Sequence, residues 1–304
     1  MGRYIVTGGA GFIGSHVVAA LAARDDDAVV VDDLSTGSRG NVPGVRVLEA
    51  DIADAEALEH ALADVGAVDG VIHCAAQASV MASIADPARD RAVNANGTRH
   101  VLAACGRLRA PLVLASTAAV YGVAAPLPTP ESAPIAPASP YAASKAEAEE
   151  AVRAAAAEDD LPHAICRLAN VYGPRQRGDG EAGVVAVIAH RLRDGEQVVL
   201  YGNGEPTRDF VHAADVAQAL LAALGTGATC NVATGAATSV REVYDLAASV
   251  IADRCGGPLL ADLREGEILH SRLDPARAAE VLGWRASTAV TDGVPAAIRA
   301  LAGG

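Results

Sequence analysis

A tyrosine and a lysine lie four positions apart in the segment Tyr141-Ala142-Ala143-Ser144-Lys145. On an α-helix, residues i and i+4 share a face, so both side chains can act on one hydroxyl group. An ammonium beside a phenol stabilises the phenolate, and we therefore expect the Tyr141 pKa to be drawn down from about 10 toward working pH. Such a tyrosine can take the proton from a sugar or alcohol O–H while hydride leaves the carbon. Because the same spacing is common in ordinary helices, the interpretation depends on the rest of the chain.

The residues around this pair favour a helix. Ser139 is a good N-cap, and Pro140 at the first helical position loses no intrahelical hydrogen bond. The alanine- and glutamate-rich run over 141–160 then propagates as helix. The sequence therefore predicts a long helix that carries both side chains near its start.

The bulk composition excludes several classes of protein. Of the 304 residues, 51% are hydrophobic but only 3% are aromatic, so the core must be built mainly from Ala, Val, Leu and Ile. A formal net charge of −13 gives no broad basic surface for a phosphate backbone, and we expect no nucleic-acid partner. Because no stretch of about 18 apolar residues is present, we also expect no membrane partner.

The cysteines and histidines lack the spacing of a metal site. The five cysteines are dispersed, odd in number and free of Cys-x-x-Cys, which argues against a disulfide framework or a structural zinc site. Among the eight histidines, His73 and His212 are interpreted as structural, and we expect no metal. The first strand is predicted to begin by Tyr4, which leaves no room for a signal peptide, so we expect a cytoplasmic protein.

The N-terminal segment has the pattern of a dinucleotide-binding unit. A short apolar strand leads into the glycine turn 7–14, which opens a helix, and a second strand over 28–31 ends in Asp32 and Asp33. The glycines let the backbone approach a pyrophosphate, whose charge lies at the helix N-terminus. An ordinary tight turn does not explain three glycines followed by this acid. Asp32 is expected to accept hydrogen bonds from the adenosine ribose and to repel a 2′-phosphate, which favours NAD over NADP.

Strands and helices continue to alternate beyond this unit. Further strands are expected over 45–48, 70–73 and 112–115, separated by helices over 55–63 and 86–108. This alternation predicts an α/β fold with a Rossmann-type doubly wound parallel sheet.

The pattern becomes less regular toward the C-terminus, where a smaller C-terminal α/β substrate lobe is expected. We predict an NAD-binding Rossmann domain over 1–170, with a return segment near 209–233, and a second lobe over 171–304. Six prolines between Val123 and Pro140 mark a long irregular segment of the sort that often covers an active site.

Six motifs in fixed order make the chain recognisable. They are Thr7–Gly14 (TGGAGFIG), Asp32–Gly37 (DDLSTG), Ser116–Gly122 (STAAVYG), Tyr141–Lys145 (YAASK), Asn170–Gln176 (NVYGPRQ) and Arg208–Val211 (RDFV). Together they resemble the extended short-chain dehydrogenase/reductases that act on nucleotide sugars, and specifically the UDP-glucose (UDP-galactose) 4-epimerases. The resemblance runs nearly end to end, from Tyr4 to the segment Leu282-Gly283-Trp284.

The resemblance implies catalytic and cofactor-binding residues. Thr117, four residues before Tyr121, matches the family's catalytic Ser or Thr and would hydrogen-bond the sugar 4-oxygen next to Tyr141, while Lys145 would bind the nicotinamide ribose. The residues that would hold NAD are Gly8, Gly11, Phe12, Ile13, Gly14, Asp32, Asp33, Leu34, Ser35, Gly37, Asp51, Ile52, Cys74, Ala75, Ala76, Gln77, Asn94, Tyr141 and Lys145.

The implied substrate is a UDP-sugar. The residues that would bind it are Ser79, Thr117, Tyr141, Asn170, Val184, Tyr201, Arg208, Arg264 and Ser271. Arg208 and Arg264 suit a diphosphate because guanidinium groups pair with phosphate oxygens in bidentate fashion. Ser271 matches the position that walls the pocket near the sugar C2 substituent, where a small residue admits an N-acetyl group; the alternative is a turn residue away from the sugar.

The residues after Thr117 discriminate between related reactions. The 4,6-dehydratases that the chain resembles place Asp-Glu there, because elimination of water needs an added acid and base. The similar decarboxylases carry a Glu at the second of these positions. Here the two positions are Ala118 and Ala119. Oxidation at C4 and return of hydride to the opposite face of a 4-keto sugar is the remaining reaction, and it regenerates NAD at each turnover.

Three alternatives to this epimerase stay open, together with the oligomeric state. Arg177 could read a C6 carboxylate, as in a UDP-glucuronate 4-epimerase, or be a solvated loop charge. The chain could also be another nucleotide-sugar-modifying enzyme, or a non-catalytic NAD-binding regulator, although such regulators usually lack the Tyr/Lys pair. Family resemblance suggests a homodimer joined through the helices over 86–108 and 141–160.

Overall fold

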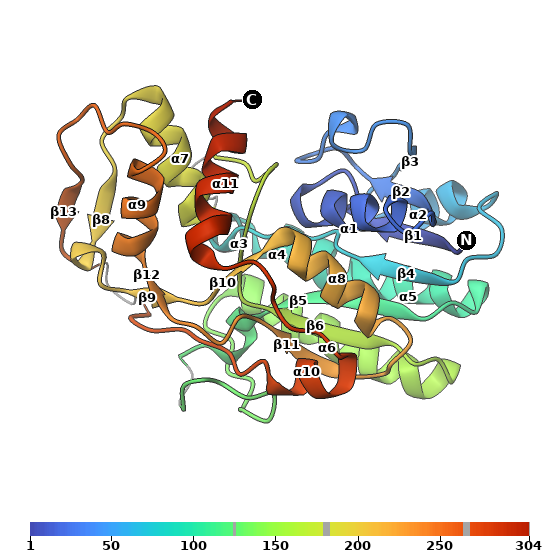
Figure 1. Cartoon of the computed structure of the whole chain (residues 1–304). Helices are drawn as coiled ribbons and strands as arrows, with labels where there is room; N and C mark the ends of the chain where they lie inside the picture. Colours follow the sequence, from blue (N-terminus) through green and yellow to red (C-terminus); the bar gives the residue numbers. More distant parts are fainter. Residues whose placement is uncertain (124–125, 179–182, 264–267, 304) are drawn as a thin grey trace.

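The computed structural model describes residues 1–123, 126–178, 183–263 and 268–303 of the chain. In this described part the central element is a seven-stranded parallel sheet in the order β11-β6-β5-β4-β1-β2-β3 (Figure 1). Its strands are β1 (Arg3–Thr7), β2 (Asp27–Asp32), β3 (Arg46–Glu49), β4 (Gly70–His73), β5 (Leu112–Thr117), β6 (Ala164–Leu168) and β11 (Thr229–Val232). The strand order reverses between β1 and β4, and ligands of such sheets bind outside the carboxyl ends of the strands at this point.

Helices cover both faces of the sheet, because successive residues of a buried strand point to opposite sides. In β2, Val30 packs in one core with helices α1 and α8, whereas its neighbour Val31 packs in a second core with α2, α5 and α6. These helices are α1 (Phe12–Ala22), α2 (Ala55–Leu62), α5 (Gly97–Leu108), α6 (Pro140–Asp159) and α8 (Ala213–Ala223). The predicted Rossmann-type doubly wound parallel sheet is confirmed.

Helix α6 begins as its sequence predicts. Ser139 is the N-cap and accepts a hydrogen bond from the backbone N–H of Ala142 at 3.1 Å, and Pro140 occupies the first turn. The helix ends where Asp160 adopts a left-handed conformation with φ of 52°. Tyr141 and Lys145 therefore lie in its first two turns, above the carboxyl end of β5.

The prediction of a single helix over 86–108 is wrong in one respect. The structure has a short helix α4 (Pro87–Arg91), then a π-helical turn η2 (Ala92–Asn96), then α5. The wider turn lets the buried Asn94 side chain leave the helix surface and bond to Gln77, which precedes the helix α3 (Val80–Ala85). Turns of this kind occur mostly as single-turn interruptions of α-helices, often at functional sites.

A second group of elements lies to one side of the sheet (Figure 1). Helices α7, α9 and α11 enclose a separate core there that includes Leu200 and Ile298. The elements are β7 (Asn170–Tyr172), α7 (Val184–Asp194), β8 (Val199–Tyr201), β9 (Thr207–Arg208), β10 (Phe210–His212), β12 (Thr238–Ser239), α9 (Val240–Ala248), β13 (Leu259–Ala261) and α11 (Val290–Ala302). Strands β7 and β10, β8 and β13, and β9 and β12 form pairs. Helix α10 (Ala276–Leu282) instead packs on β11. The domain limits 1–170 and 171–304 stay a prediction.

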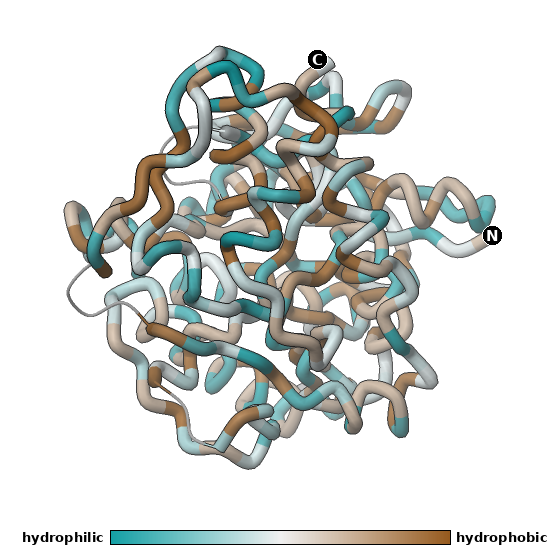
Figure 2. The backbone as a smooth tube through the Cα atoms, turned by 60° about the vertical axis from the view of Figure 1, so that its left-hand side comes forward, coloured by the Kyte–Doolittle hydropathy of each residue, from teal (hydrophilic) through white to brown (hydrophobic). Residues whose placement is uncertain are grey.

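Hydrophobic and hydrophilic residues alternate along most of the backbone in Figure 2. Accordingly, among the described residues no helix is both long and apolar enough to cross a membrane.

Candidate active site

Tyr141, Lys145 and Thr117 meet where α6 passes the carboxyl end of β5. The Tyr141 phenol is hydrogen-bonded to the Thr117 side chain. The Lys145 ammonium donates to the backbone oxygen of Ala115 at 2.8 Å, and the Lys145 side chain is buried. Because an ammonium has three N–H groups, this bond uses one of them. The three predicted catalytic residues thus lie in one place.

The expected depression of the Tyr141 pKa is wrong. Burial raises the pKa of the Tyr141 phenol, the hydrogen bond with Thr117 lowers it, and the negative charge of Asp90 raises it further. The reason is the burial of the phenol, whose effect outweighs the hydrogen bond with Thr117. At neutral pH the Tyr141 phenol is therefore protonated and placed to donate.

Lys145 is the only lysine in the chain, and burial lowers the pKa of its ammonium to about 8. The negative charges of Glu149 and, to a smaller extent, Asp90 act against burial and raise it. The ammonium consequently titrates much closer to neutral pH than a solvated lysine, whose pKa is about 10.4. Small changes in the surrounding charges therefore decide whether Lys145 is charged in the working range.

The glycine turn has room for backbone only. A Cβ on Gly14 would lie 2.2 Å from the carbonyl oxygen of Gly8, and Gly8 itself has a φ of +66°. Helix α1 starts at Phe12, and its N-cap Gly11 offers no side chain to the first backbone N–H groups. These groups are therefore directed at whatever lies beyond the turn, as in sites that bind pyrophosphate. The turn fits a dinucleotide.

Asp32 and Asp33, at the end of β2, shape the loop that follows. The buried Asp32 carboxylate accepts hydrogen bonds from the backbone N–H of Ala10 and of Leu34, each at 2.9 Å. Burial raises the Asp32 pKa, and these two bonds lower it. Asp33 is exposed and accepts from the Ser35 hydroxyl at 2.6 Å. An ionised carboxylate has about four acceptor sites, more than these hydrogen bonds use, so a ribose hydroxyl can still be bound.

The segment after β4 is fixed by Asn94. The Asn94 side chain accepts from the Gln77 backbone N–H at 2.9 Å and donates to the Gln77 carbonyl at 2.9 Å. The same amide nitrogen also lies 3.1 Å from Asp90 Oδ1 and 3.1 Å from the Ser144 hydroxyl of α6, so its two N–H groups are shared among three acceptors. Ser79 caps helix α3. Direct contact of these residues with a dinucleotide stays a prediction; what the structure gives Asn94 is the role of holding Gln77 beside α6.

The remaining predicted cofactor residues lie along the same edge. The Gly8 turn approaches the segment 74–77, since a Cβ on Gly8 would lie 2.6 Å from the Ala75 nitrogen. Asp51 follows β3 and forms an ion pair with Arg89 at 2.8 Å, and Ile52 is buried.

The predicted substrate residues come from several elements. Asn170 lies on β7, paired with β10, and its side chain is exposed. Val184 begins α7, and Tyr201 ends β8. Arg264 lies outside the described residues.

Arg208 and Ser271 lie near one another. The Ser271 backbone N–H donates to the Thr207 carbonyl at 3.1 Å, and the Arg208 guanidinium donates to the same carbonyl at 2.9 Å. Ser271 lines a small cavity together with Ala118 and Tyr121, which follow Thr117. The structure therefore brings Ser271 toward the catalytic end of β5, and Arg208 lies beside Ser271 through the Thr207 carbonyl that both contact.

His73 links the glycine turn to the π-helical turn. Its Nδ1 lies 2.6 Å from the Thr7 hydroxyl and its Nε2 lies 3.0 Å from the Thr98 hydroxyl. The Thr98 hydroxyl donates its proton to the Asn94 carbonyl, so Nε2 must carry the histidine proton and Nδ1 must accept from Thr7. Burial, and next the charge of Lys145, lower the His73 pKa to about 3. His73 is therefore neutral, consistent with its interpretation as structural.

Two buried residues beside the site were missed in the sequence: Asp90 and Glu149. Glu149 stands four positions after Lys145, so helical spacing alone places it on the same face. Nothing in the sequence around Asp90 distinguishes it from other acids near a helix start. Its burial follows from the packing of α4 against α6.

Comparison with known proteins identifies the family. The model of the NAD dependent epimerase/dehydratase family matches residues 4–233. The chain belongs to this family. It is 40% identical over 307 residues to a UDP-glucose 4-epimerase from Mycolicibacterium smegmatis, with 96% of each protein covered.

Solved structures of other members of this family have the same fold as this chain. A UDP-glucose 4-epimerase from Thermotoga maritima, crystallised with UDP-glucose, aligns with a TM-score of 0.93 and 36% identity over 98% of each chain. A UDP-glucose 4-epimerase from Thermus thermophilus, in complex with NAD, aligns with a TM-score of 0.90 and 39% identity over 99% of each chain.

The buried neutral His73 makes folding acid-sensitive. An unfolded histidine has a pKa of about 6.5, so as the pH falls from 6.5 toward 3 the unfolded state binds a proton that the folded state does not. We expect His73 to remove up to about 1.4 kcal/mol of unfolding free energy per pH unit in that window. In His73→Gln this contribution is lost, and the dependence on pH becomes shallower.

Urea unfolding at pH 7, 6 and 5 measures the effect as a difference in slope between wild type and variant. His16, whose pKa burial lowers to about 4, contributes equally to both proteins and cancels. Equal slopes would contradict the assignment.

Proposed function

We propose that this protein is an NAD-dependent UDP-hexose 4-epimerase, which interconverts UDP-glucose and UDP-galactose through a transient 4-keto sugar. The observation that carries the proposal is the meeting of Tyr141, Lys145 and Thr117 at the end of β5, beside a glycine turn that fits a dinucleotide. The family membership and the UDP-glucose 4-epimerases that match nearly the whole chain support the same reaction.

The site has groups suited to the pyrophosphate and to the adenosine ribose of NAD. The first turn of α1, at Phe12 and Ile13, would receive the pyrophosphate, and Asp32 the adenosine ribose. When bound, NAD would supply the hydride acceptor for C4 and the positive charge of its nicotinamide ring. Lys145 would hold the nicotinamide ribose with the N–H groups that Ala115 does not use.

The proton transfer falls to Tyr141 and Thr117. Their hydrogen bond places both hydroxyls on one point above β5, where the sugar 4-oxygen would replace one of the two partners. Thr117 would orient that oxygen. In the oxidation the Tyr141 phenolate would accept the proton of the 4-hydroxyl as hydride leaves C4, and in the reduction the resulting phenol would return this proton to the 4-keto oxygen as hydride comes back. Burial raises the pKa of Tyr141, which favours the second of these transfers.

The surroundings favour epimerisation over elimination. Ala118 and Ala119, directly after Thr117, offer no acid or base for water loss at C5 and C6. Arg208, Asn170, Val184, Tyr201 and Arg264 are proposed to bind the uridine diphosphate. These roles rest on the family resemblance.

Arg177 argues against the UDP-glucuronate alternative. Its guanidinium donates to the Thr36 carbonyl at 3.5 Å, within the loop proposed to hold the adenosine end of NAD. A residue that reads the C6 carboxylate must instead reach the sugar at the other end of the cofactor. The presence of Thr117, Tyr141 and Lys145 together likewise disfavours a non-catalytic regulator.

The first prediction from this proposal concerns Tyr141→Phe, which removes only the phenolic O–H. We expect the conversion of UDP-galactose to UDP-glucose to slow by about 10²–10⁴-fold, the usual range for a positioned acid/base. NAD should stay bound, and mass spectrometry of the denatured variant measures it. Tyr4→Phe, on β1 away from the site, is the control. Activity within a few-fold of wild type, or release of mainly NADP, would refute the respective assignment.

The second prediction concerns the sugar C2 substituent. Because Ser271 is small, we propose that the enzyme also epimerises UDP-N-acetylglucosamine, and that Ser271→Tyr selectively removes this activity. A pocket that merely tolerates an extra group discriminates by about 10–200-fold at most, so the substitution should lower kcat/KM for the N-acetylated sugar by about 10-fold or more relative to UDP-glucose. Ser249→Tyr, at an exposed position after α9, is the control. An unchanged kcat/KM ratio shows that Ser271 is not the gate.

We further propose a cytoplasmic homodimer. All five cysteines are free thiols, as expected of a reducing compartment. A groove between α5 and α6 is lined by the small side chains of Ala103, Ala151 and Ala154, which permit the close approach of a second copy. Arg99 on one helix and Glu158 on the other edge this groove, so two antiparallel copies would bring opposite charges together.

Light scattering tests the dimer. The chain mass is 30.6 kDa, and we expect wild type to have twice this mass in solution. Ala154→Arg places a long cation in the groove and should give a monomer, whereas Ala22→Arg, at an exposed position on α1, should stay dimeric. A monomeric wild type contradicts this proposal.

A further inference from the structure

Three consecutive residues at the end of β5 contact three residues of α6 that are spaced four positions apart. The Ala115 carbonyl accepts from Lys145, and the Thr117 side chain bonds to Tyr141. Between them, the Ser116 hydroxyl donates to the Glu149 carboxylate at 2.6 Å. Because residues four apart share one helix face, these contacts together set both the rotation and the axial position of α6 on the strand. Two of the three involve proposed catalytic side chains, and the third is Glu149.

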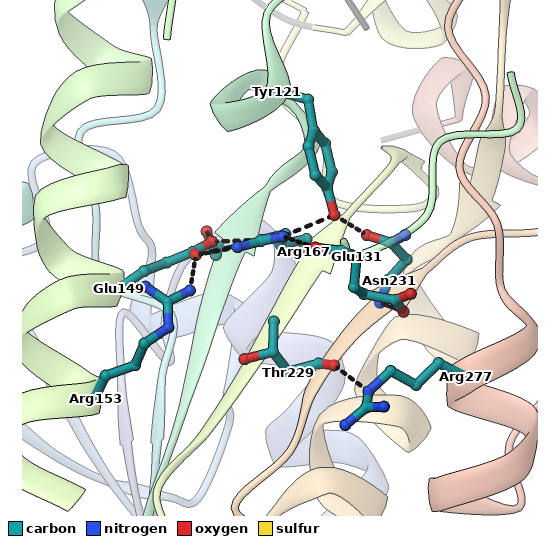
Figure 3. Close-up of polar contacts among 9 residues, drawn as sticks. Tyr121, Glu131, Glu149, Arg153, Arg167, Thr229, Asn231 and Arg277 are labelled. Atoms are coloured by element: carbon teal, nitrogen blue, oxygen red, sulfur yellow. Dashed lines mark hydrogen bonds and ion pairs between the residues drawn. The ribbon is translucent and has the colours of Figure 1, made fainter. Parts of the chain in front are cut away.

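Glu149 is a buried carboxylate held at several points (Figure 3). Arg167 on β6 reaches it with two parallel N–H groups, Nε to Oε1 at 2.9 Å and Nη2 to Oε2 at 2.7 Å. Arg153 on α6 adds a bond at 2.7 Å from the exposed side. Burial raises the Glu149 pKa, but the bonds from Arg167, Ser116 and Arg153 outweigh it and the pKa is lowered. The carboxylate therefore stays charged.

The guanidinium of Arg167 extends this contact to the turn after β5. Its Nη1 donates to the Tyr121 hydroxyl at 2.9 Å, and Tyr121 donates to Asn231 on β11 at 2.8 Å (Figure 3). Tyr121 ends the short 3₁₀ turn η3 (Ala118–Tyr121), for which Thr117 is the N-cap. The same ion pair thus holds both the helix that carries Tyr141 and the turn that begins at Thr117.

We propose that Glu149 is a positioning residue for the epimerase reaction, one that aligns Lys145 and Tyr141 with Thr117. The proposal rests on the proposed function for its catalytic meaning. Glu149 is not among the residues proposed to bind the sugar or the dinucleotide. It acts through the two residues that precede it on its helix face.

The charges that face Lys145 support this role. Tyr141 and Glu149 lie on its own helix, Asp90 on α4, and His73 and Cys74 at the end of β4. His73 is neutral, and burial raises the pKa of the Cys74 thiol to about 12, so neither carries charge near neutral pH. The carboxylates of Glu149 and Asp90 are left to oppose burial, and Glu149 has the larger effect.

Loss of the Glu149 charge is expected to lower the Lys145 pKa. Loss of the Glu149 charge removes the largest influence that raises the Lys145 pKa, so the ammonium loses its proton at lower pH. Because the Lys145 ammonium must be charged to act, its deprotonation at lower pH reduces activity in the alkaline part of the pH profile. In Glu149→Gln we expect the Lys145 titration midpoint to fall from about 8 by on the order of one pH unit, together with the alkaline limb of kcat.

The single lysine of the chain makes this shift directly measurable. Protein labelled with ¹⁵N-lysine gives one side-chain resonance, whose titration in the NAD-bound holoprotein reports Lys145 without any assay of turnover. In parallel, kcat and KM for UDP-galactose are measured from pH 6 to pH 10. We expect kcat to fall by about tenfold at the alkaline end, the change that one pH unit produces, with KM unchanged.

Arg153→Ala is the matched control, because Arg153 contacts the same carboxylate from the exposed side and leaves its charge in place. We expect its Lys145 midpoint to stay or to move upward. An unchanged midpoint in Glu149→Gln, or an equal downward shift in Arg153→Ala, would overturn the proposal. A shifted midpoint in Glu149→Gln, together with a wild type that has no epimerase activity, would instead overturn the proposed function.

A second variant tests the proposal in case Glu149→Gln does not fold. Glu149→Gln leaves the buried Arg167 guanidinium without its counter-charge, which is strongly destabilising. The double variant Glu149→Gln with Arg167→Met removes both charges. Loss of the Arg167 cation acts upward on the Lys145 midpoint, so we expect a smaller downward shift than in Glu149→Gln alone. A downward shift supports the proposal, and a midpoint at or above the wild-type value overturns it.

Discussion

The register of α6 on the end of β5 is the constraint on which the site depends. Residues four apart on a helix share one face. Only one rotation of α6 therefore brings Tyr141, Lys145 and Glu149 into contact with three consecutive residues of β5. The sheet supplies the fixed side of this contact, because β5 lies between β4 and β6 in its interior. The cap at Ser139 supplies the other, since it determines where the helix begins.

Burial at this contact acts on opposite charges in opposite ways. It raises the pKa of the Tyr141 phenol and lowers that of the Lys145 ammonium, so it favours the neutral form of both groups. The buried Glu149 and Arg167 pair lies directly behind them and limits the effect on the lysine. Breaking a buried pair of this kind typically costs about 3–5 kcal/mol, because one charge is left uncompensated. The polar core of the protein is therefore as much a part of the site as the residues that face the ligand.

The sequence predicted what is determined locally. The strands and helix starts follow from short apolar runs, from glycines and from caps such as Ser139, all of which act within a few residues. The parallel sheet was likewise predicted correctly. Three features were not, because each depends on a distant segment. The π-helical turn at Asn94 is accommodated by contacts with Gln77 and Ser144. The raised Tyr141 pKa follows from tertiary burial, and the Glu149 partner is an arginine on another strand.

A lysine that is both unique and buried also changes how the folded protein meets amine chemistry. Lys145 carries the only primary amine among the side chains of the chain, and this side chain is buried. Reagents that acylate amines should therefore leave the side chains of the native protein unmodified. Acylation of this one side chain would instead report that the contact between α6 and the carboxyl edge of the sheet has opened.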